Sequence, residues 1–313
     1  FVPAPEVMFS CVRIRVDNIM IRDIANIVKF LQFFPLCANY LHLVAEVCLS
    51  GVLWTGILWF VRKKVYLCVT SALTEGDFIY FKITEIMAIR LTLEKTQKSL
   101  FCESKWWGDP DMPADASYPM MKVCEMPDGS SFLVRPGDDV FGGEVYDYPL
   151  TFICQIRCED IAELDPENRL PHEGMLYFFA AMDEYTGYDS PVHMGMGEWP
   201  KGSVSVKYTK TINMETFQAC MMVDEDGESL TEPALGISFE ACDDAADGIK
   251  LLGAPFFSDA REQFPGYSNL LQIDEDETAG ITFYDTGMLN FLVSDTDFAK
   301  GLLKRPVGVL CSL

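Results

Sequence analysis

The chain has 313 residues, of which 49% are hydrophobic, and carries a formal net charge of -23. This apolar content supports one large or two modest hydrophobic cores and excludes a disordered chain. The charge argues against nucleic-acid binding, because an acidic surface repels phosphate backbones and the acidic part has no basic stripe with interleaved aromatic residues. We expect a basic protein, a cation or a neutral molecule as partner; the alternative is that the acidic surface only maintains solubility.

The cysteines give a second constraint on the class of protein. All eleven are scattered along the chain, and the one regular spacing is the C-x-x-x-C of Cys154 and Cys158. An odd number without a C-x-x-C pair indicates neither a disulfide framework nor a zinc knuckle. We therefore expect buried free thiols in a reducing cytoplasm, with no bound metal and no cofactor.

The first quarter of the chain differs in composition from the rest. Residues 1–74 hold seven basic and four acidic side chains, so 17 basic and 43 acidic side chains remain for the other 239 residues. Residues 17–34 place apolar side chains at helical spacing behind a candidate N-cap at Asp17, and Pro35 would end that helix. Because the chain starts at Phe1 rather than Met, we expect the numbering to begin inside a longer reading frame or after processing.

An apolar stretch follows, in which Glu46 is the one charged residue between Phe30 and Val61. Its uncharged run, Val47–Val61, has 15 residues, whereas a helix needs roughly 20 residues to cross a bilayer. Three interpretations stay open: a buried helical hairpin, a membrane segment formed by insertion of residues 36–61, or residues outside the natural domain. Length and Glu46 count against the membrane, so we interpret residues 1–75 as an apolar helical extension.

A six-residue pattern of Lys, two bulky apolar residues, Gly, any residue and Pro occurs twice, as KWWGDP from Lys105 and as KLLGAP from Lys250. Three further pairs of blocks recur in the same order: LTLE and ISFE, FICQI and NLLQI, GMLYFF and GMLNFL. This order predicts an internal duplication, with copies at about 86–183 and 231–300 of a domain at 76–313. The first copy has an insertion of about 28 residues, whose acidic, Gly-rich sequence predicts a loop or hairpin.

The repeated blocks have the composition of strands. IRLTL and LGISF alternate apolar and polar residues, which predicts half-buried strands, whereas TFICQI, MLYFFA and MLNFLV predict strands buried on both faces. Gly174 and Gly287 are expected to open the last strand of each copy at a sharp turn, and the Gly-x-Pro of each lysine motif predicts a stiff corner. Short helices are expected at 159–164, 214–222 and 296–303.

Together these elements predict an α+β fold that is predominantly β, with few short helices and two similar halves around a shared core.

The same segments resemble the YwqG-like family of bacterial proteins, a domain of unknown function, over roughly residues 83–313. The resemblance implies that family's fold and a bacterial cytosolic protein, and it implies no activity. Trp107-Gly108 stands where the family usually has Gly-Gly, so that loop is assigned no backbone role. The segments that carry the resemblance are ESKWWGDPDMP, YPLTFICQI, LPHEGMLYFF, KLLGAP and LLQIDEDETAGITFYDTGMLNFLV.

Polar residues recur in pairs inside otherwise apolar blocks: Lys105 and Lys250, Gln155 and Gln272, Glu94 and Glu240. Buried polar groups need partners, so the favoured interpretation pairs each Lys with a Glu and lets each Gln join two backbones. The functional alternative places the lysines and glutamines face to face across a pseudo-twofold axis. There they would line a pocket for a polar ligand, with Asp274 and Asp285 as further candidates.

No motif in the sequence identifies a reaction. G-x-S-x-G, phosphate-binding glycine loops and H-E-x-x-H do not occur, and the three histidines are His42, His172 and His193. The segment 274–285 places Asp, Asp and Thr at positions 1, 3 and 5 of a calcium-type loop, but its Gly is at position 7 instead of 6. We interpret it as an acidic hairpin turn.

Two functional hypotheses follow. The first is a non-enzymatic cytosolic binding protein whose acidic surface engages a basic partner, as an inhibitor or immunity-type protein would. The second is an enzyme or small-molecule binder that uses the cleft between the two halves. The sequence leaves the ligand and the oligomeric state open.

Overall fold

The chain divides into two compact units, Phe1–Glu85 and Ile86–Leu313, and each is considered by itself. The computed structural model describes residues 12–16, 41–49, 52–61, 64–71, 78–83, 88–135, 137–223, 226–227, 229–284 and 286–312. The boundary lies ten residues after the predicted one, because β5 (Phe78–Ile83) pairs with β4 (Lys64–Ser71) and so belongs to the first unit.

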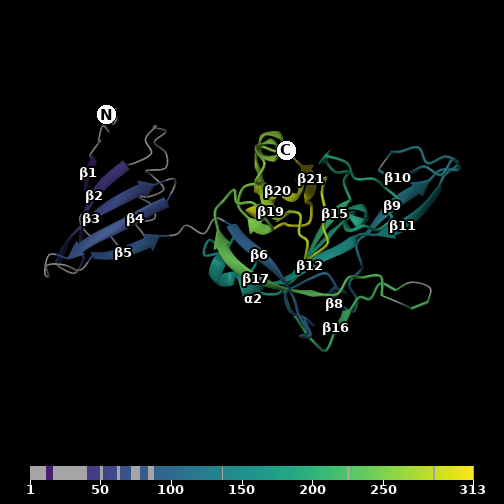
Figure 1. Cartoon of the computed structure of the whole chain (residues 1–313), viewed down its shortest axis with the longest axis horizontal. Coiled ribbons are helices and arrows are strands. Elements are labelled where there is room, and N and C mark those ends of the chain that lie inside the picture. The colour runs from purple at the N-terminus through teal and green to yellow at the C-terminus, as the bar shows by residue number, and fades with distance from the viewer. Residues whose placement is uncertain are drawn as a thin grey trace. The chain divides into compact units, whose positions relative to one another are not determined.

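The first unit is a five-stranded sheet with the order β1-β2-β3-β4-β5 (Figure 1). β1 (Val12–Val16) runs parallel to β2 (Leu41–Leu49), and the other neighbours are antiparallel, including the pair of β2 with β3 (Val52–Val61). The predicted helical hairpin is therefore wrong. A short apolar run rich in Val, Leu and Trp has no period that separates a buried helix from a strand, and here two segments of 9 and 10 residues form strands.

Two further interpretations of the sequence concerned this unit, a membrane segment at 36–61 and a helix at 17–34. No helix among the described residues is long and apolar enough to cross a membrane. The predicted helix at 17–34 lies outside the described residues.

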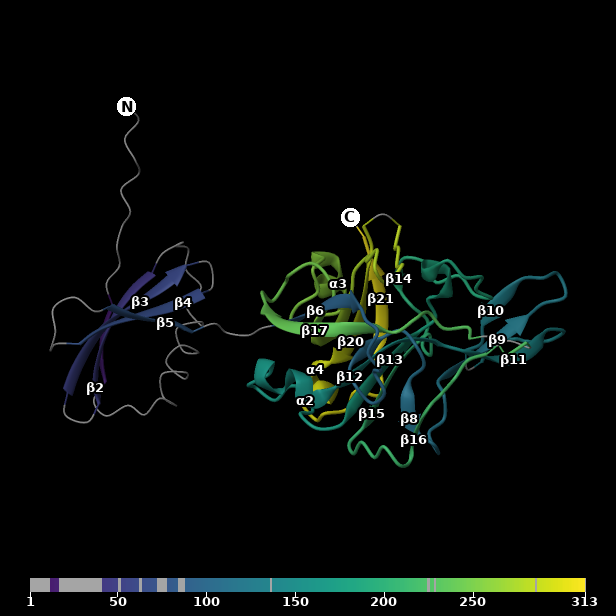
Figure 2. The ribbon, with the colours of Figure 1, turned by 60° about the horizontal axis from the view of Figure 1, so that its bottom comes forward.

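The second unit is built on an 11-stranded sheet whose order is symmetric about its central pair (Figures 1 and 2). The order is β14-β21-β20-β19-β18-β6-β17-β7-β12-β13-β15. The strands of the first half are β6 (Ala88–Lys95), β7 (Lys105–Trp106), β12 (Thr151–Arg157), β13 (Met175–Ala180) and β15 (Val204–Thr209). Those of the second half are β17 (Leu235–Cys242), β18 (Lys250–Leu252), β19 (Tyr267–Ile273), β20 (Met288–Ser294) and β21 (Val307–Cys311), and β14 (Gly197–Glu198) lies at the edge.

The first strand of each half is exchanged into the other half. β6 pairs with β17 along its whole length and with β18 of the second half, while β17 pairs with β7 of the first half. All the repeated blocks predicted as strands are strands, and the β-rich fold with few short helices is confirmed.

The large sheet curls so that its two outer parts meet. Phe178 of β13 packs edge-on against Phe291 of β20, with ring centroids 5.7 Å apart, although six strands separate β13 from β20 in the sheet. These two residues occupy the same position in the GMLYFF and GMLNFL blocks. The backbone amide of Trp199 also donates to Gly308 of β21 at 2.8 Å. The curl gives both halves one shared hydrophobic core, as predicted.

The two lysine motifs form matched corners. Trp107 and Gly108 have φ of 57° and 70°, and Leu252 and Gly253 have φ of 62° and 73°, so each corner consists of two consecutive left-handed residues. Trp107 and Leu252 are almost fully buried, and their packing offsets the cost of a left-handed conformation for a residue with a Cβ. A β-bulge also occurs at matched sites, in β12 after Phe152 and in β19 after Asn269.

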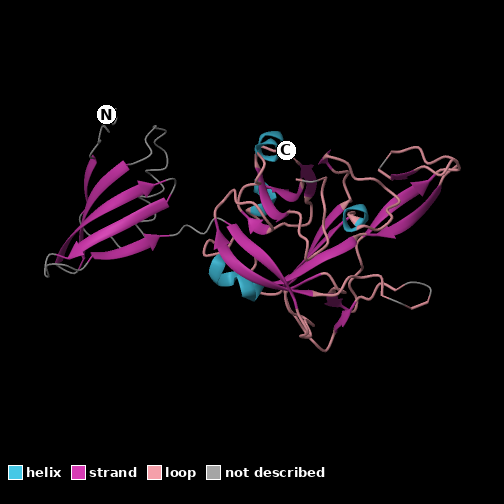
Figure 3. Cartoon of the chain, in the orientation of Figure 1, coloured by secondary structure: helices cyan, strands magenta, loops and turns pink. Residues whose placement is uncertain are grey.

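The second unit has two smaller β-structures outside the large sheet (Figure 3). The insertion of the first half forms a three-stranded arm of β9 (Met120–Glu125), β10 (Ser131–Leu133) and β11 (Glu144–Pro149), which projects from the sheet in Figure 1 and agrees with the predicted hairpin. β8 (Asp111–Pro113) pairs with β16 (Phe217–Ala219). The predicted helix at 214–222 is therefore wrong, because pairing with β8 holds this segment extended.

The helices are short. The segment at 159–164 is helical as predicted, as α2 (Cys158–Ile161) and the 3-10 turn η1 (Ala162–Leu164). At 296–303 only α4 (Asp295–Phe298) forms, because Gly301 with φ of 68° ends it. α3 (Ser258–Gln263) and the 3-10 turn η2 (Asp183–Thr186) were not predicted.

Replacement of Gly253 by Ala tests the second corner. A Cβ there would lie 2.4 Å from the carbonyl oxygen of Asp244 and 2.8 Å from Ala88 Cβ, in a left-handed conformation. We expect the free energy of unfolding to fall by about 2–4 kcal/mol in urea denaturation. The control is Gly187→Ala, which has φ of 87° but no atom within 4 Å of the new Cβ, and should cost only about 1 kcal/mol. Equal losses of unfolding free energy in the two variants would show that close packing around Gly253 does not exclude a Cβ there.

Candidate functional site

Lys105 lies in a buried network beside the first corner. Its Nζ donates to Asp111 Oδ2 at 2.8 Å, and the side chains of both residues are less than a tenth exposed. The same carboxylate oxygen accepts the Cys102 amide and Gln155 Nε2, each at 2.8 Å. Gln155 also joins two backbones, because its Oε1 accepts the Asp111 amide at 2.9 Å and its Nε2 donates to Glu103 O at 2.8 Å.

Lys250 lies in the matching network of the second half, with different partners. Its Nζ donates to the carbonyl oxygens of Asp244 and Ala254, each at 2.7 Å, and no carboxylate within 4.0 Å pairs with it among the described residues. Gln272 joins two backbones as Gln155 does, because it accepts the Phe256 amide at 2.8 Å and donates to Gly248 O at 2.8 Å. Burial lowers the pKa of Lys250 from its ordinary value of 10.5 to about 8.

The two networks do not converge. β6 and β17 lie between the strands that carry Lys105 and Lys250, and neither lysine lines any of the three pockets described below. Each Gln has the backbone-joining role of the favoured interpretation. The predicted Glu partners are wrong, since Glu94 and Glu240 point outward on half-exposed strands and are exposed. The partner of Lys105 instead comes from β8, directly after the corner.

Asp274 borders the network of Lys250 and Gln272 through Gly248, and among the described residues no hydrogen bond or ion pair connects it to either lysine. Asp274 is half-buried, and its carboxylate accepts the amides of Gly248 and Glu275 at 2.9 and 2.8 Å. Burial raises its pKa. Asp276 and Ile281 form an antiparallel bridge with the Ala279 amide bound to Asp276 Oδ1, which is the predicted acidic hairpin turn. Asp285 lies outside the described residues.

Potential metal ligands and thiols are the next groups of side chains. The described part of the chain contains no group of three His, Cys, Asp or Glu side chains that could hold a metal ion. The seven cysteines of the second unit are free, five of them buried and Cys220 and Cys242 half-buried. Burial raises the pKa of the Cys102, Cys154 and Cys158 thiols, so these thiols stay protonated and unreactive at neutral pH.

A pocket of about 400 Å³ that the sequence did not predict opens beside the first corner. We call it the aromatic pocket. It is lined by Trp107, Gly108, Tyr118, Tyr148, Pro149, Leu150, Thr151, Phe152, Asp183, Thr186, Tyr188, Asp189, Met222, Leu230, Thr231 and Glu232. Five of these residues are aromatic and three are carboxylic acids, and none is Lys, Arg or His.

Hydrogen bonds fix the polar side of the aromatic pocket. The Tyr148 hydroxyl donates to Asp183 Oδ2 at 2.9 Å and the Thr151 hydroxyl donates to Asp183 Oδ1. The Tyr188 hydroxyl donates to Glu232 Oε1. Burial and the Asp183 charge raise the pKa of Tyr148, and the hydrogen bond to Glu232 raises that of Tyr188, so both phenols stay neutral. The charge of the pocket is therefore carried by its carboxylates.

The walls of the aromatic pocket come from segments that the two halves do not share. Tyr148 belongs to the inserted arm, Asp183 and Tyr188 belong to η2 and the loop after it, and Glu232 belongs to the segment between β16 and β17. The repeated blocks supply the floor, with Trp107 at the corner. A search for repeats therefore points away from this site. The signal that could have found it is the interleaving of Tyr with acids in YDYP at 146–149 and DEYTGYDS at 183–190.

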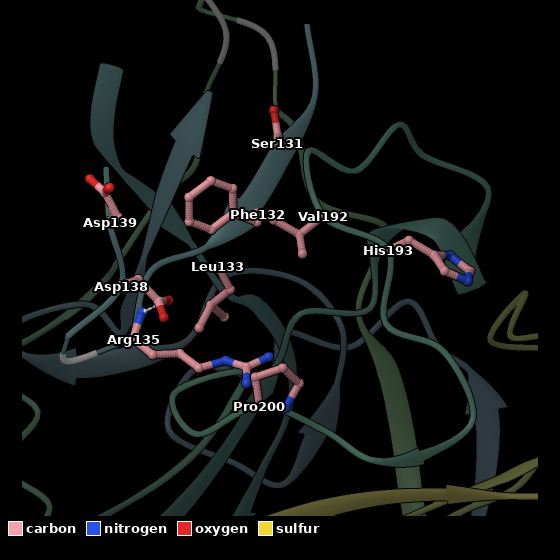
Figure 4. Close-up of a pocket in the computed structure, with 9 residues that line it drawn as sticks. All are labelled: Ser131, Phe132, Leu133, Arg135, Asp138, Asp139, Val192, His193 and Pro200. Carbon is pink, nitrogen blue, oxygen red and sulfur yellow. Dashed lines mark hydrogen bonds between the residues drawn. The ribbon is translucent and has the colours of Figure 1, made fainter. Parts of the chain in front are cut away.

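Two further pockets lie near the aromatic pocket and the arm. One of about 430 Å³ shares Trp107, Thr186 and Glu232 with the aromatic pocket and lies between the halves, with Lys95 from the first and Glu277 from the second. The other, of about 580 Å³, lies between the arm and residues 192–200 (Figure 4). There Arg135 extends toward Pro200 beneath Phe132, whereas the His193 ring points away from the pocket.

The arrangement of the aromatic pocket suits a positively charged group. Aromatic faces attract cations through their quadrupoles, and carboxylates pair with ammonium or guanidinium groups. Asp183 and Glu232 already accept hydrogen bonds, whereas Asp189 is exposed and has no partner among the described residues. An incoming cation would thus find aromatic side chains and an unpaired carboxylate, with no basic side chain of the lining to repel it.

Comparison with known proteins gives a family but no function. Residues 104–305 match a family described as a domain of unknown function (DUF1963). No curated protein matches the chain. The matched residues include the first corner and every described residue that lines the aromatic pocket.

Replacement of Lys105 by Met tests the first network. The change leaves Asp111 charged and buried with only two of its three donors, so the free energy of unfolding should fall by about 3–5 kcal/mol in urea denaturation. Lys122→Met is the control, because Lys122 pairs with Asp147 at 2.9 Å with both side chains more than half exposed. It should cost less than about 1 kcal/mol. Similar losses would contradict a buried structural pair.

The lowered pKa of Lys250 predicts a pH dependence of stability. Between pH 8 and 10.5 the unfolded chain holds the lysine proton that the folded chain has lost, so this group makes unfolding harder as pH rises. Lys250→Met removes this contribution. The unfolding free energy of the wild type minus that of the variant should therefore increase across this window, measured by urea denaturation at each pH. A constant difference would show that the amine titrates as it does in water.

Proposed function

The chain belongs to the family of the domain of unknown function DUF1963, whose description assigns no activity, so we propose a function from the aromatic pocket. The protein binds a basic partner and takes one of the partner's ammonium or guanidinium groups into this pocket. The observation that carries the proposal is the composition of the lining, with five aromatic residues, three carboxylates and no basic residue around about 400 Å³.

The charge of the whole protein supports the same proposal. The net charge of -23 produces a negative potential that draws a basic partner toward the surface and speeds its encounter. The potential alone does not select a site. The pocket adds a place where a cation leaves water for aromatic faces, which strengthens its attraction to the nearby carboxylates.

The pocket also explains why a duplicated scaffold would carry an insertion in one half only. Tyr148 of the arm and Tyr188 of the loop after η2 both line the pocket, while Trp107 lies at the corner that both halves share. On this proposal the symmetric sheet is the support and the unrepeated segments are the binding surface. Internal duplication, likeness to the bacterial YwqG-like proteins, a cytoplasmic location and, for the aromatic pocket, a non-enzymatic inhibitor or immunity-type role are parts of the same proposal.

The proposal is tested with a fluorescein-labelled peptide of alternating Arg and Gly, whose binding is measured by fluorescence anisotropy. We expect binding at low salt that weakens at high salt, and no binding of the peptide with Glu in place of Arg. Asp189→Asn combined with Tyr188→Ala should raise the Kd at least about tenfold, because the variant loses a carboxylate and an aromatic face.

Glu262→Gln is the matched control. Glu262 is an exposed carboxylate on α3 and does not line the pocket, so its replacement changes the net charge by the same amount as Asp189→Asn. Its Kd should stay within about twofold of the wild type. If Glu262→Gln weakens binding as much as the pocket variant, attraction is a matter of overall charge and the pocket is not the site.

A further inference from the structure

Outside the aromatic pocket, Glu184, His193 and Tyr284 form a chain of polar contacts from three segments. Glu184 belongs to η2, His193 to the loop that follows, and Tyr284 to the turn before β20. The Glu184 carboxylate accepts the Met194 amide on Oε1 at 2.7 Å and contacts His193 Nδ1 with Oε2. His193 Nε2 lies 3.2 Å from the Tyr284 hydroxyl.

The acceptor-only carboxylate determines the tautomer of the imidazole. A carboxylate cannot donate, so Nδ1 of the neutral His193 carries the ring proton and donates it to Glu184. Nε2 is then left with its lone pair toward the Tyr284 hydroxyl, which donates to it. This is the order in which a carboxylate orients a base and the base withdraws a proton from a nucleophile.

The backbone holds Tyr284 in an unfavourable conformation to make this contact. Its φ is 52°, a left-handed value that costs a residue with a Cβ roughly 1–2 kcal/mol. The preceding Phe283 is fixed, since its amide donates to Glu275 Oε1 at 2.9 Å and its carbonyl accepts the Gly287 amide. The contact is thus imposed by the fold, and such strain collects at functional positions.

Solvent reaches His193 and Tyr284, the two residues that would react. The His193 side chain is 67% exposed and Tyr284 is 47% exposed. Behind them the buried Tyr185 hydroxyl lies 3.4 Å from the Tyr284 hydroxyl and donates to Met194 O. Because the His193 ring points away from the 580 Å³ pocket, a small molecule would approach from open solvent.

We propose that Tyr284 is a nucleophile for acyl groups, with His193 as its general base and Glu184 as the residue that positions His193. The Tyr284 oxygen attacks the carbonyl carbon of a small activated ester while His193 Nε2 takes the phenolic proton. The bond to the leaving oxygen breaks as that oxygen takes the proton from His193, which leaves an ester on Tyr284. Water, activated by His193, then cleaves this ester and restores the phenol.

The proposal is independent of cation binding in the aromatic pocket, so each can fail without the other. It is tested on the full chain with p-nitrophenyl acetate, by the release of p-nitrophenolate and by mass spectrometry of the acid-quenched protein. We expect an initial burst of about one equivalent per chain and an acetyl group on Tyr284. Tyr284→Phe should abolish both signals, and His193→Gln should slow acetylation about 100-fold.

Tyr267→Phe is the matched control, because Tyr267 is a comparably exposed tyrosine, at 39%, that contacts no histidine among the described residues. It should leave the burst unchanged. Equal acetylation of Tyr267 and Tyr284 in the wild type, or an unchanged rate in His193→Gln with an unchanged thermal melting temperature, would overturn the proposal.

Glu184→Gln separates positioning from a merely structural role. Without the carboxylate nothing fixes the Nδ1 proton of His193, so acetylation should slow, whereas Glu184→Asp keeps a carboxylate and should recover most of the rate. Equal rates in Glu184→Gln and Glu184→Asp would remove Glu184 from the proposed site.

Discussion

The contact of Phe178 with Phe291 is the interaction on which the arrangement of the second unit depends. It brings together strands from opposite ends of the sheet order and so turns the sheet into a curl around one core. The curl also brings the loop after β13 against the turn before β20, where the Thr282 amide donates to Tyr185 O at 3.0 Å. The contact of His193 with Tyr284 follows from this closure.

Similar halves support different chemistry because their loops differ. In the second half the corner packs against Asp244 and Ala88, whereas the first corner packs against Ala234 and also borders the aromatic pocket through Trp107 and Gly108. The lysines follow the same rule. Lys105 has a carboxylate partner from β8, and Lys250 has backbone carbonyls only, although both glutamines bind the backbone alike. The repeated blocks thus give both halves the same strand and corner geometry, while the loops around each lysine determine whether its partner is charged.

The sequence predicted what depends on local pattern. Alternating apolar and polar residues and short apolar runs located the paired strands, and Gly-x-Pro located both corners, because each of these signals lies within a few residues of sequence. It could not predict what depends on distant pairing. Segment 214–222 has helical composition but pairs with β8, and residues 41–61 have no period that tells strand from helix. The aromatic pocket was missed for the same reason, since Tyr118, Tyr188 and Glu232 come from segments far apart in the sequence.

The exchange of β6 and β17 has a consequence for the origin of the chain. Each half gives its first strand to the other, and the two first strands pair with each other in antiparallel register from Ala88 with Cys242 to Lys95 with Leu235. On the duplication proposed above, an ancestral single copy could complete this sheet only as a twofold-symmetric dimer with swapped strands. On the same proposal, fusion would have made this dimer interface intramolecular, and the arm would be an addition to one of the two copies.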